Sequence, residues 1–320
     1  MNGGATTQVT QTRARRPWVA LIAATRLEAE PLLEAWGAEN KTGETESPDK
    51  HGKAPGFVTT EIIHRRWHVF TDIPGAHRGG EDMGAVVVET GYDKTNTAQA
   101  LTSLLERARA SWLPVPAHPD WDPKPRLVLQ FGIAGAYPPS GLDVGDLVVA
   151  TEEIYGDTGA WTPEGWLSTE CFGMPLLEVA GRPSWNRFVL DRAVAGRATR
   201  RLRWREPGAV EGSADVAHVE AGSCITMSCV TGTSEQADEL WQRWGVLAES
   251  MEGAAAAQVC LLYGVPLLEV RAISNLVGDR DRGQWDVTGA AARAARAAAY
   301  LLARIGEILP PNPDGPGDEG

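Results

Sequence analysis

Short hydrophobic runs alternate with amphipathic or alanine-rich segments along most of the chain. Apolar runs bounded by turn residues are typical of buried strands. The strands predicted in this way are Val19–Ala24, Gly84–Glu89, Leu127–Phe131, Asp146–Thr151, Ser223–Cys229 and Pro266–Ile273. Because helical patterns separate these runs, we expect an α/β protein, a three-layer α/β/α sandwich around one mixed central β-sheet.

Helices are expected between the strands, at Thr97–Ala110, Thr233–Trp244, Ser250–Tyr263 and Thr288–Leu309. The first carries leucines at helical spacing along one stripe. The second opens with a capping box between Thr233 and Gln236 and stops at Gly245. Thr288 is expected to cap the last helix.

The polar ends of the chain frame one predicted domain. Residues 1–16 are rich in Thr, Gln and Arg, and residues 310–320 are rich in Pro, Gly and acidic residues, so both segments are expected to be disordered. Between them we expect a single domain over residues 17–309. Residues 112–125 are rich in proline and predict a surface insertion, whose role the sequence leaves open.

The charge of the chain limits its expected partners. It has 30 Lys and Arg against 42 Asp and Glu, a net charge of −12 at pH 7. Nucleic acids and anionic membranes bind cationic faces, so we expect neither as a partner. No apolar run reaches the length of a membrane span. The cysteines and histidines show no metal-ligand spacing, so we expect reduced thiols in a cytoplasmic protein and no catalytic metal.

Candidate chemistry begins where the Leu127–Phe131 run meets Gly132-Ile133-Ala134-Gly135. Small residues at the end of a strand let the backbone approach a ligand closely. A tight turn that needs glycine at positive φ explains the same residues. Taken alone, the pattern favours the turn.

Two further segments carry polar side chains at the ends of predicted elements. Glu252 lies in Ala248–Gly253, where a carboxylate could accept hydrogen bonds from a vicinal diol and Met251 could lie against a sugar face. Acidic residues favoured by the dipole at a helix N-terminus are the alternative explanation. Ser274 and Asn275 end an apolar strand, where open α/β folds bind ligands, although Asn is also a common turn residue.

Taken together, these segments resemble the purine nucleoside phosphorylase and nucleosidase superfamily. The resemblance is carried by ALIAATRLEAEPLL, GIAGAY, LDVGDLVVATEE and ESMEGAAAAQVCLLYGVPLLEVRAISN, spread over residues 19–309. Within the superfamily the chain looks like the futalosine hydrolases, nucleosidases of the alternative menaquinone pathway. The resemblance implies a nucleoside phosphorylase-like fold, a purine nucleoside as substrate, no cofactor, and a homodimer or higher homo-oligomer.

The resemblance assigns water activation to Glu28 and sugar binding to Glu252. In related nucleosidases the glutamate that matches Glu28 activates the water that attacks the anomeric carbon. An exposed acid at a helix start is the alternative. Glu252 is expected to hold the ribose hydroxyls, with Met251 against the sugar. Ser250 stands where adenine-cleaving relatives have an acidic residue, so its contact with ribose is expected to be weaker or made differently.

Asn275 is expected to be a catalytic residue that discriminates between purines. Adenine-cleaving relatives have Asp at the matching position, which accepts from a 6-amino group. The amide of Asn275 can instead donate to O6 and accept from a protonated N7, with Ser274 in support. Arg271 is expected to orient its neighbours without touching the substrate. The other substrate-binding residues implied by the resemblance are Ile133, Ala134, Gly135, Cys229 and Val230, with Cys229 expected to be packed in the wall around the base.

These roles predict hydrolysis of the N-glycosidic bond of futalosine, which releases hypoxanthine and leaves dehypoxanthinyl futalosine. Open alternatives are a 6-oxopurine nucleoside phosphorylase, a methylthioadenosine/S-adenosylhomocysteine-type nucleosidase, and a nucleoside-binding protein without activity. The sequence does not separate futalosine from aminodeoxyfutalosine. Arg26, Arg280, Arg282 and Trp285 are candidates for contact with the 5′ substituent or the base, although solvated surface or ordinary packing explains each of them.

Overall fold

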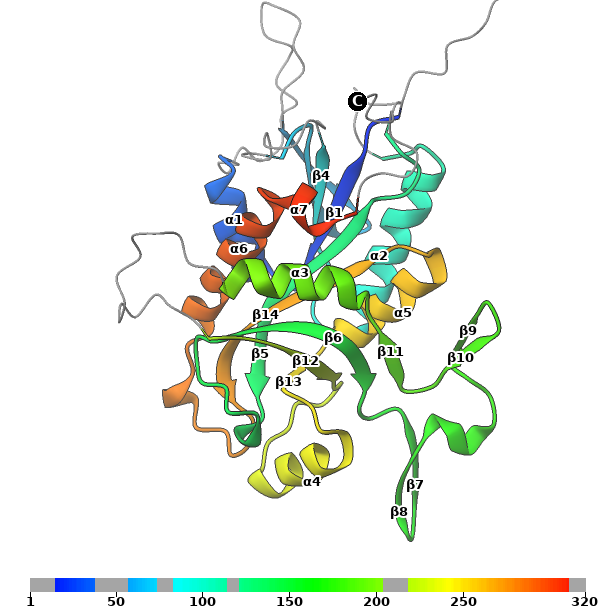
Figure 1. Ribbon diagram of the computed structural model, residues 1–320, viewed down its shortest axis with the longest axis vertical. Coiled ribbons are helices and arrows are strands. Elements are labelled where there is room, and N and C mark those ends of the chain that lie inside the picture. Colours follow the sequence, from blue (N-terminus) through cyan, green and yellow to red (C-terminus); the bar gives the residue numbers. More distant parts are fainter. Residues whose placement is uncertain (1–14, 38–56, 74–82, 114–120, 204–217, 311–320) are drawn as a thin grey trace, which may run out of the picture.

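A mixed β-sheet runs through the centre of the molecule (Figure 1). The computed structural model describes residues 15–37, 57–73, 83–113, 121–203 and 218–310. Within these residues the sheet has ten strands: β1 (Trp18–Ala23), β2 (Phe57–Ile62), β3 (Arg65–Phe70), β4 (Gly84–Glu89), β5 (Leu127–Ala136), β6 (Leu147–Tyr155), β11 (Arg187–Val189), β12 (Val219–Thr226), β13 (Ala248–Ser250) and β14 (Leu267–Leu276). β4, β1, β5 and β14 are parallel neighbours, whereas β2, β3 and β4 pair antiparallel. The predicted mixed sheet is therefore confirmed.

The sheet closes on itself at one end. β14 pairs in parallel with β5 and antiparallel with β6. From β6, successive pairings lead through β12 and β13 back to β5. These five strands therefore form a ring, which brings side chains from β6, β12 and β14 into contact with one another.

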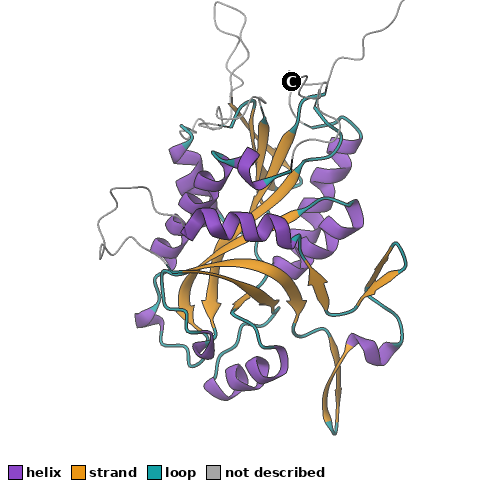
Figure 2. Ribbon diagram, in the orientation of Figure 1, coloured by secondary structure: helices purple, strands orange, loops and turns teal. Residues whose placement is uncertain are grey.

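Helices cover both faces of the sheet (Figure 2). They are α1 (Arg26–Ala35), α2 (Lys94–Arg109), α3 (Arg192–Arg203), α4 (Ser234–Trp244), α5 (Gly253–Tyr263), α6 (Val287–Leu302) and α7 (Ile305–Ile308). Alternate residues of β1 pack into two separate cores: one contains side chains from α2 and α5, the other side chains from α1, α3, α6 and α7. Burial on both faces explains why the strand is a continuous hydrophobic run. The three-layer arrangement is confirmed.

Two small hairpins stand out from the rest of the described chain (Figure 1). They are β7 (Gly159–Thr162) with β8 (Gly165–Ser168), and β9 (Leu177–Val179) with β10 (Arg182–Ser184). Each forms a two-stranded sheet that is separate from the central one.

The strand that begins at Leu127 is longer than predicted. β5 continues through Gly132 and Gly135 to Ala136, because β14 pairs with it along this stretch. Neither glycine has a positive φ. The tight turn favoured by the sequence pattern is therefore wrong, and the small residues serve another purpose.

The predicted helices form, with shifted ends. The Thr233 side chain accepts a hydrogen bond from the Gln236 backbone N–H, and Gly245 ends the helix in the left-handed conformation, as expected. The alanine-rich helix begins at Gly253 and not at Ser250. Ser250, its expected first residue, instead ends the short strand β13 and pairs with Thr226 of β12.

The last predicted helix is interrupted. α6 ends at Leu302, and the short α7 follows it. Asp286, and not Thr288, caps α6, because its carboxylate accepts from the Gly289 N–H at 2.9 Å. The expected cap at Thr288 is therefore wrong.

Part of the proline-rich insertion packs against the sheet. Trp121 is buried and stacks on Trp18, with ring centroids 5.7 Å apart. Residues 114–120 of the insertion lie outside the described residues, as do residues 1–14 and 311–320 of the predicted tails. None of the described helices combines the length and hydropathy needed to cross a membrane.

Candidate active site

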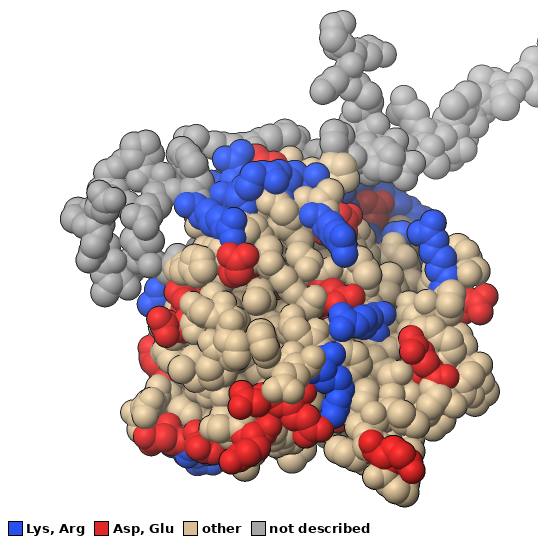
Figure 3. Space-filling model, turned by 60° about the horizontal axis from the view of Figure 1, so that its bottom comes forward, with Lys and Arg blue, Asp and Glu red and all other residues tan. Residues whose placement is uncertain are grey.

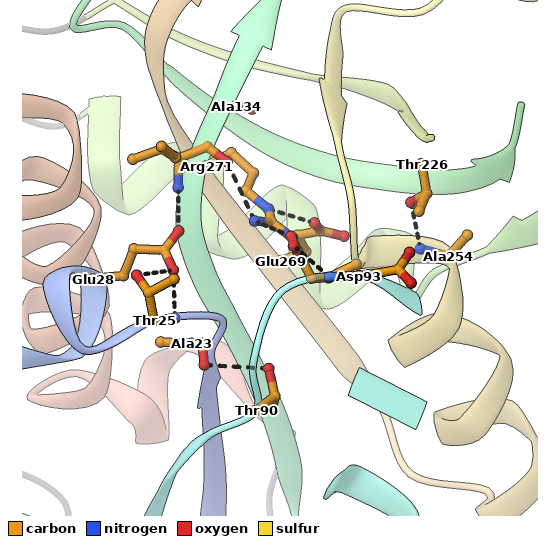
Figure 4. Close-up of polar contacts among 12 residues, drawn as sticks. Ala23, Thr25, Glu28, Thr90, Asp93, Ala134, Thr226, Ala254, Glu269 and Arg271 are labelled. Atoms are coloured by element: carbon orange, nitrogen blue, oxygen red, sulfur yellow. Dashed lines mark hydrogen bonds and ion pairs between the residues drawn. The ribbon is translucent and has the colours of Figure 1, made fainter. Parts of the chain in front are cut away.

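Polar side chains gather at the carboxyl ends of parallel strands. Thr25 and Glu28 follow β1, Asp93 follows β4, and Ser274 and Asn275 lie near the end of β14. Because these strands are parallel to β5 or to its neighbour, their carboxyl ends share one edge of the sheet, the usual position of a ligand site in an α/β fold. Figure 4 shows Thr25, Glu28 and Asp93 arranged around β5 at this edge.

Glu28 is buried and its carboxylate accepts three hydrogen bonds. The Thr25 N–H and hydroxyl donate to Oε2 at 2.9 and 3.0 Å. The Ile133 N–H donates to Oε1 at 3.0 Å. β1 ends at Ala23 and does not reach Ile133, so the side chain of Glu28 takes the place of a strand partner. The alternative of an exposed acid is therefore wrong, although Glu28 does cap α1.

Glycines in β5 make room for these side chains. A Cβ on Gly132 would lie 3.0 Å from Glu28 Cδ and from Arg271 Nη1, and closer still to Glu28 Oε1. A Cβ on Gly135 would lie 3.0 Å from Asn275 Nδ2. The small residues of β5 therefore allow the close approach of neighbouring side chains.

Arg271 joins the strand to two carboxylates. It is buried, and its Nε donates to Glu269 at 2.7 Å. Its Nη1 donates to Glu252 Oε2 at 3.1 Å and to the Ile133 carbonyl at 3.3 Å. Burial lowers the pKa of Arg271, but the surrounding carboxylates, Glu269 foremost, raise this pKa above its ordinary value overall. The guanidinium therefore remains charged.

Glu252 precedes α5 and is also buried. Burial raises the pKa of Glu252. The positive charge of Arg271 lowers this pKa and the negative charge of Glu28 raises it further, so the pKa lies above its ordinary value overall. The Asp93 N–H points at Glu252 Oε1 from 3.3 Å. Asp93 has a φ of 81°, which is uncommon for a residue other than glycine, so its backbone adopts an unfavourable conformation where it meets the carboxylate.

Asn275 is held by its neighbours at the edge of the sheet. Its Oδ1 accepts from Ser274 Oγ at 2.8 Å, and its Nδ2 donates to the Leu276 carbonyl at 3.0 Å. Ser274 Oγ also lies 3.2 Å from the Ala134 carbonyl. Among the described residues, one amide N–H and one lone pair of Oδ1 remain without a partner. The structure thus brings Asn275 and Ser274 together with Ala134 and Gly135.

Glu249 anchors the segment that was expected to surround the base, a role that the sequence did not predict. Its Oε1 accepts from the Thr231 N–H at 2.8 Å, and its Oε2 accepts from Thr231 Oγ1 at 2.5 Å and from Tyr137 Oη at 2.9 Å. Burial raises the pKa of Glu249, although the bonds from Thr231 oppose the shift. Cys229 and Val230 remain exposed before this anchor, so the expected packing of Cys229 is wrong.

Ser250 is the last residue of β13, and Met251 follows it in the connection to α5. Ser250 is buried, and no described group lies within hydrogen-bond reach of its Oγ. Met251 is half-buried. The Ser250 hydroxyl is therefore a buried polar group that no described residue satisfies.

The basic residues considered for the 5′ substituent have other surroundings. Arg26 donates to Glu30 and Glu89. Arg280 stacks on Trp285, 4.8 Å from the ring centroid. These contacts explain both arginines without a ligand.

The described residues contain no group of three or more His, Cys, Asp or Glu that could hold a metal ion.

Figure 3 shows one face of the molecule, on which Lys and Arg gather mainly toward the upper border and Asp and Glu mainly toward the lower one. Uncharged residues fill much of the area between them.

The chain is similar in sequence to several curated enzymes. A futalosine hydrolase from Thermus thermophilus is 36% identical over 231 residues, which cover 72% of this chain and 87% of the relative. A futalosine hydrolase from Streptomyces coelicolor is 35% identical, over 58% of this chain and 65% of its own. A 5'-methylthioadenosine/S-adenosylhomocysteine nucleosidase from Geobacillus thermodenitrificans is 28% identical, over 64% of this chain and 72% of its own.

Solved structures match the whole architecture. An S-adenosylhomocysteine nucleosidase from Streptococcus pyogenes, in complex with 5-methylthiotubericidin, superimposes with a TM-score of 0.63 at 20% identity, covering 91% of this chain and 98% of its own. The expected nucleoside phosphorylase-like fold is therefore confirmed. The model of the Phosphorylase superfamily matches residues 19–307. The chain belongs to the phosphorylase superfamily.

Proposed function

We propose that this protein is a purine nucleosidase that hydrolyses the N-glycosidic bond of futalosine, releasing hypoxanthine and leaving dehypoxanthinyl futalosine. The observation that carries the proposal is the cluster around Ile133, where Glu28 and Arg271 bind the same residue of β5 and Arg271 continues to Glu252. The futalosine hydrolase relatives support the choice of substrate.

Glu28 activates the attacking water. Its carboxylate is fixed by donors from Thr25 and Ile133, so its position does not depend on the substrate. One oxygen lone pair can accept the proton of a water that attacks the anomeric carbon. As the bond from this carbon to the purine breaks, positive charge develops on the sugar, and a nearby carboxylate stabilises that charge.

Glu252 binds the sugar hydroxyls. Arg271 and the Asp93 N–H hold its carboxylate, and each carboxylate oxygen can accept more than one hydrogen bond. A vicinal diol can therefore donate to Glu252 while these contacts persist. Met251, next to it, packs against the sugar ring.

Asn275 recognises a 6-oxopurine. Ser274 donates to Oδ1 and so orients the amide, whose remaining N–H can donate to O6 while Oδ1 accepts from a protonated N7. An amide transfers no proton in this arrangement, so the proton at N7 comes from water. An unpaired buried polar group costs about 1–3 kcal/mol, so an adenine base is disfavoured by about 10–150-fold.

Hydrolysis is favoured over phosphorolysis by the partners of the nearby cations. Arg271 already binds Glu269 and Glu252, and Arg26 binds two carboxylates. Phosphate binding relies on charge-assisted hydrogen bonds from arginines that are not already neutralised. Water is the simpler nucleophile at this site.

The experiment follows base release by liquid chromatography. Futalosine, inosine and methylthioadenosine are each incubated with the purified protein, with and without phosphate. We expect hypoxanthine from futalosine at the same rate in both buffers. Glu28→Gln is expected to lose about 10²-fold or more in kcat, whereas the matched control Glu30→Gln, on the exposed side of α1, keeps the wild-type rate.

Each other outcome would overturn the proposal in a different way. A requirement for phosphate would indicate a phosphorylase. Preference for methylthioadenosine would indicate an adenine-specific nucleosidase. Nucleoside binding without release of a base would indicate a binding protein.

A further inference from the structure

Two fully buried glutamates meet beside Arg271 and have no part in the chemistry proposed above. Glu153 belongs to β6 and Glu269 to β14, which are neighbours in the ring of strands. Both carboxyl groups lie against Gly253, the first residue of α5. A Cβ on Gly253 would lie 2.7 Å from Glu269 Oε1 and closer still to Glu153 Oε1. The glycine therefore leaves the space in which the two carboxyl groups approach each other.

The surrounding hydrogen bonds show where a proton is needed. The Ala254 N–H donates to Thr226 Oγ1 at 2.8 Å, and the single hydroxyl hydrogen of Thr226 is then directed at Glu153 Oε2, 2.7 Å away (Figure 4 shows the first contact). No described donor reaches Glu153 Oε1 or Glu269 Oε2. Two buried carboxyl groups thus lie together with acceptor oxygens that no N–H or O–H satisfies.

The charges that face Glu153 disfavour a second anion. Glu269 and Arg271 face it from β14, Cys224 from β12, and Tyr155 lies on its own strand. Among these groups Arg271 is the cation, and it already bonds Glu269. Burial and the neighbouring Glu269 raise the pKa of Glu153 well above its ordinary value. Two adjacent carboxylates in an apolar interior repel each other and lose their hydration.

We propose that Glu153 and Glu269 hold one proton between them, with Glu153 neutral and donating from Oε1 to Glu269, and that this pair positions Arg271 for the active site. Glu269 remains the anion that binds Arg271 Nε. Glu153 and Glu269 are positioning residues, because they act through Arg271. The positioning role rests on the proposed nucleosidase activity, whereas the shared proton does not.

The pair fixes the guanidinium through Nε, whereas Glu252 binds Nη1. Glu269 takes Nε, which leaves Nη1 directed at Glu252 Oε2 and the Ile133 carbonyl. The guanidinium is planar, so fixing Nε also fixes the plane in which Nη1 donates. If Glu153 loses its proton, the repulsion between the two carboxylates displaces Glu269 and with it Arg271.

Infrared spectroscopy of the full-length protein tests the shared proton without substrate. We expect the wild type to show the carbonyl band of a protonated, buried carboxylic acid at neutral pH. Glu153→Gln is expected to abolish this band, whereas Glu152→Gln, the neighbouring and partly exposed glutamate of β6, leaves it unchanged. A wild-type spectrum without the band, at a pH where the protein is folded, would overturn the shared proton.

The position of Arg271 has its own readout in the nuclear magnetic resonance signal of its Nε–H. We expect Glu269→Gln to move this signal strongly, because its charged acceptor is lost. Glu153→Gln is expected to leave it near the wild-type position, because an amide N–H replaces the carboxylic O–H. An Nε–H signal that is unchanged in Glu269→Gln would overturn the positioning role.

Kinetics connects the pair to activity. Glu153→Ala and Glu269→Gln are expected to lower kcat/KM by about 10–100-fold, the usual effect of losing an outer partner of a catalytic group. Glu153→Gln should restore most of the loss and remove the fall in activity on the alkaline side of the pH profile. Equal losses in Glu153→Gln and Glu153→Ala would contradict a donated proton. A wild type that is inactive on futalosine but shows the infrared band would refute the proposed function and leave the shared proton supported.

Discussion

Replacing Gly132 by Ala tests how closely Glu28 must approach β5. The added Cβ would lie 3.0 Å from Glu28 Cδ and from Arg271 Nη1, closer than side chains pack in folded proteins. Because Glu28 is clamped by Thr25, the strain can be relieved by breaking its bond to the Ile133 N–H. Overpacking costs about 1–3 kcal/mol, and loss of a hydrogen bond to a charged group costs about 1.5–3 kcal/mol.

Moving the Glu28 carboxylate away from Ile133 by the Gly132→Ala substitution should affect the chemical step more than substrate binding. A base shifted away from the water loses most of its contribution, so kcat is expected to fall by about 10²-fold or more. KM should change little, because in the proposed mechanism Glu28 contacts the attacking water and Glu252 contacts the sugar. The assays are initial rates of hypoxanthine release and urea denaturation of the same samples.

Gly306→Ala is the matched control. Gly306 lies in α7, and a Cβ there would meet nothing within 4 Å. This variant should keep its kcat and be as stable as the wild type or slightly more stable, because alanine favours the helix. A wild-type kcat in Gly132→Ala, or equal losses of activity in the two variants, would show that Glu28 does not need this close approach to β5.

Four further predictions test other contacts. Tyr137→Phe removes a donor to the buried Glu249 and should lower the free energy of unfolding by about 1–3 kcal/mol in urea denaturation; an unchanged midpoint would contradict the anchor. Thr233→Ala removes the cap of α4 and should cost about 1 kcal/mol in the same assay. The pKa of Glu252 is raised and the proposed sugar binding needs its carboxylate, so kcat/KM should begin to fall on acidification at a pH above the ordinary pKa of glutamate; a profile that is flat down to that pH would exclude the role. The pKa of Glu153 is also raised, so its contribution to stability is full below the ordinary pKa of glutamate. As the pH rises above that value, the free energy of unfolding should fall by up to about 1.4 kcal/mol per pH unit. Thermal melts of Glu153→Gln should lack this dependence on pH.

The strands could be predicted because helices cover both faces of the sheet. The predicted strand Gly84–Glu89 begins and ends at the same residues as β4. A strand buried on both faces is a nearly continuous apolar run, so its limits are visible in the sequence. The pairing of strands could not be predicted. β13 spans three residues and its sequence merges with the following helix, so the closed ring had no local signal. The described residues of β2 alternate between half-buried and exposed, β3 begins with two arginines, and α3 is rich in arginine, so these elements were missed.

The candidate site could be predicted where a motif resemblance reached it. The structure brings Glu28, Ile133, Arg271 and Glu252 into one hydrogen-bonded cluster. The turn expected at Gly132 is wrong, because Gly132 is needed to make room for the side chains of Glu28 and Arg271, which are distant in the sequence. No local pattern contains such a contact.

The missed residues had a weaker signal. Glu269 stands among apolar residues of a buried strand, and Glu153 is followed by the buried Ile154 and Tyr155. A charged residue at a buried position of this kind needs a partner. The sequence does not say which partner it finds. That information depends on the ring formed by β5, β6, β12, β13 and β14.

The choice of a 6-oxopurine substrate depends on the amide of Asn275, and a ratio of two specificity constants measures this selectivity. The ratio is kcat/KM for futalosine over kcat/KM for its 6-amino counterpart, aminodeoxyfutalosine, measured without phosphate for the wild type and for Asn275→Asp. The account predicts a wild-type ratio of about 10–150 that falls to about one or below in the variant. A wild type that prefers the 6-amino compound, or a ratio that the substitution leaves unchanged, would contradict it.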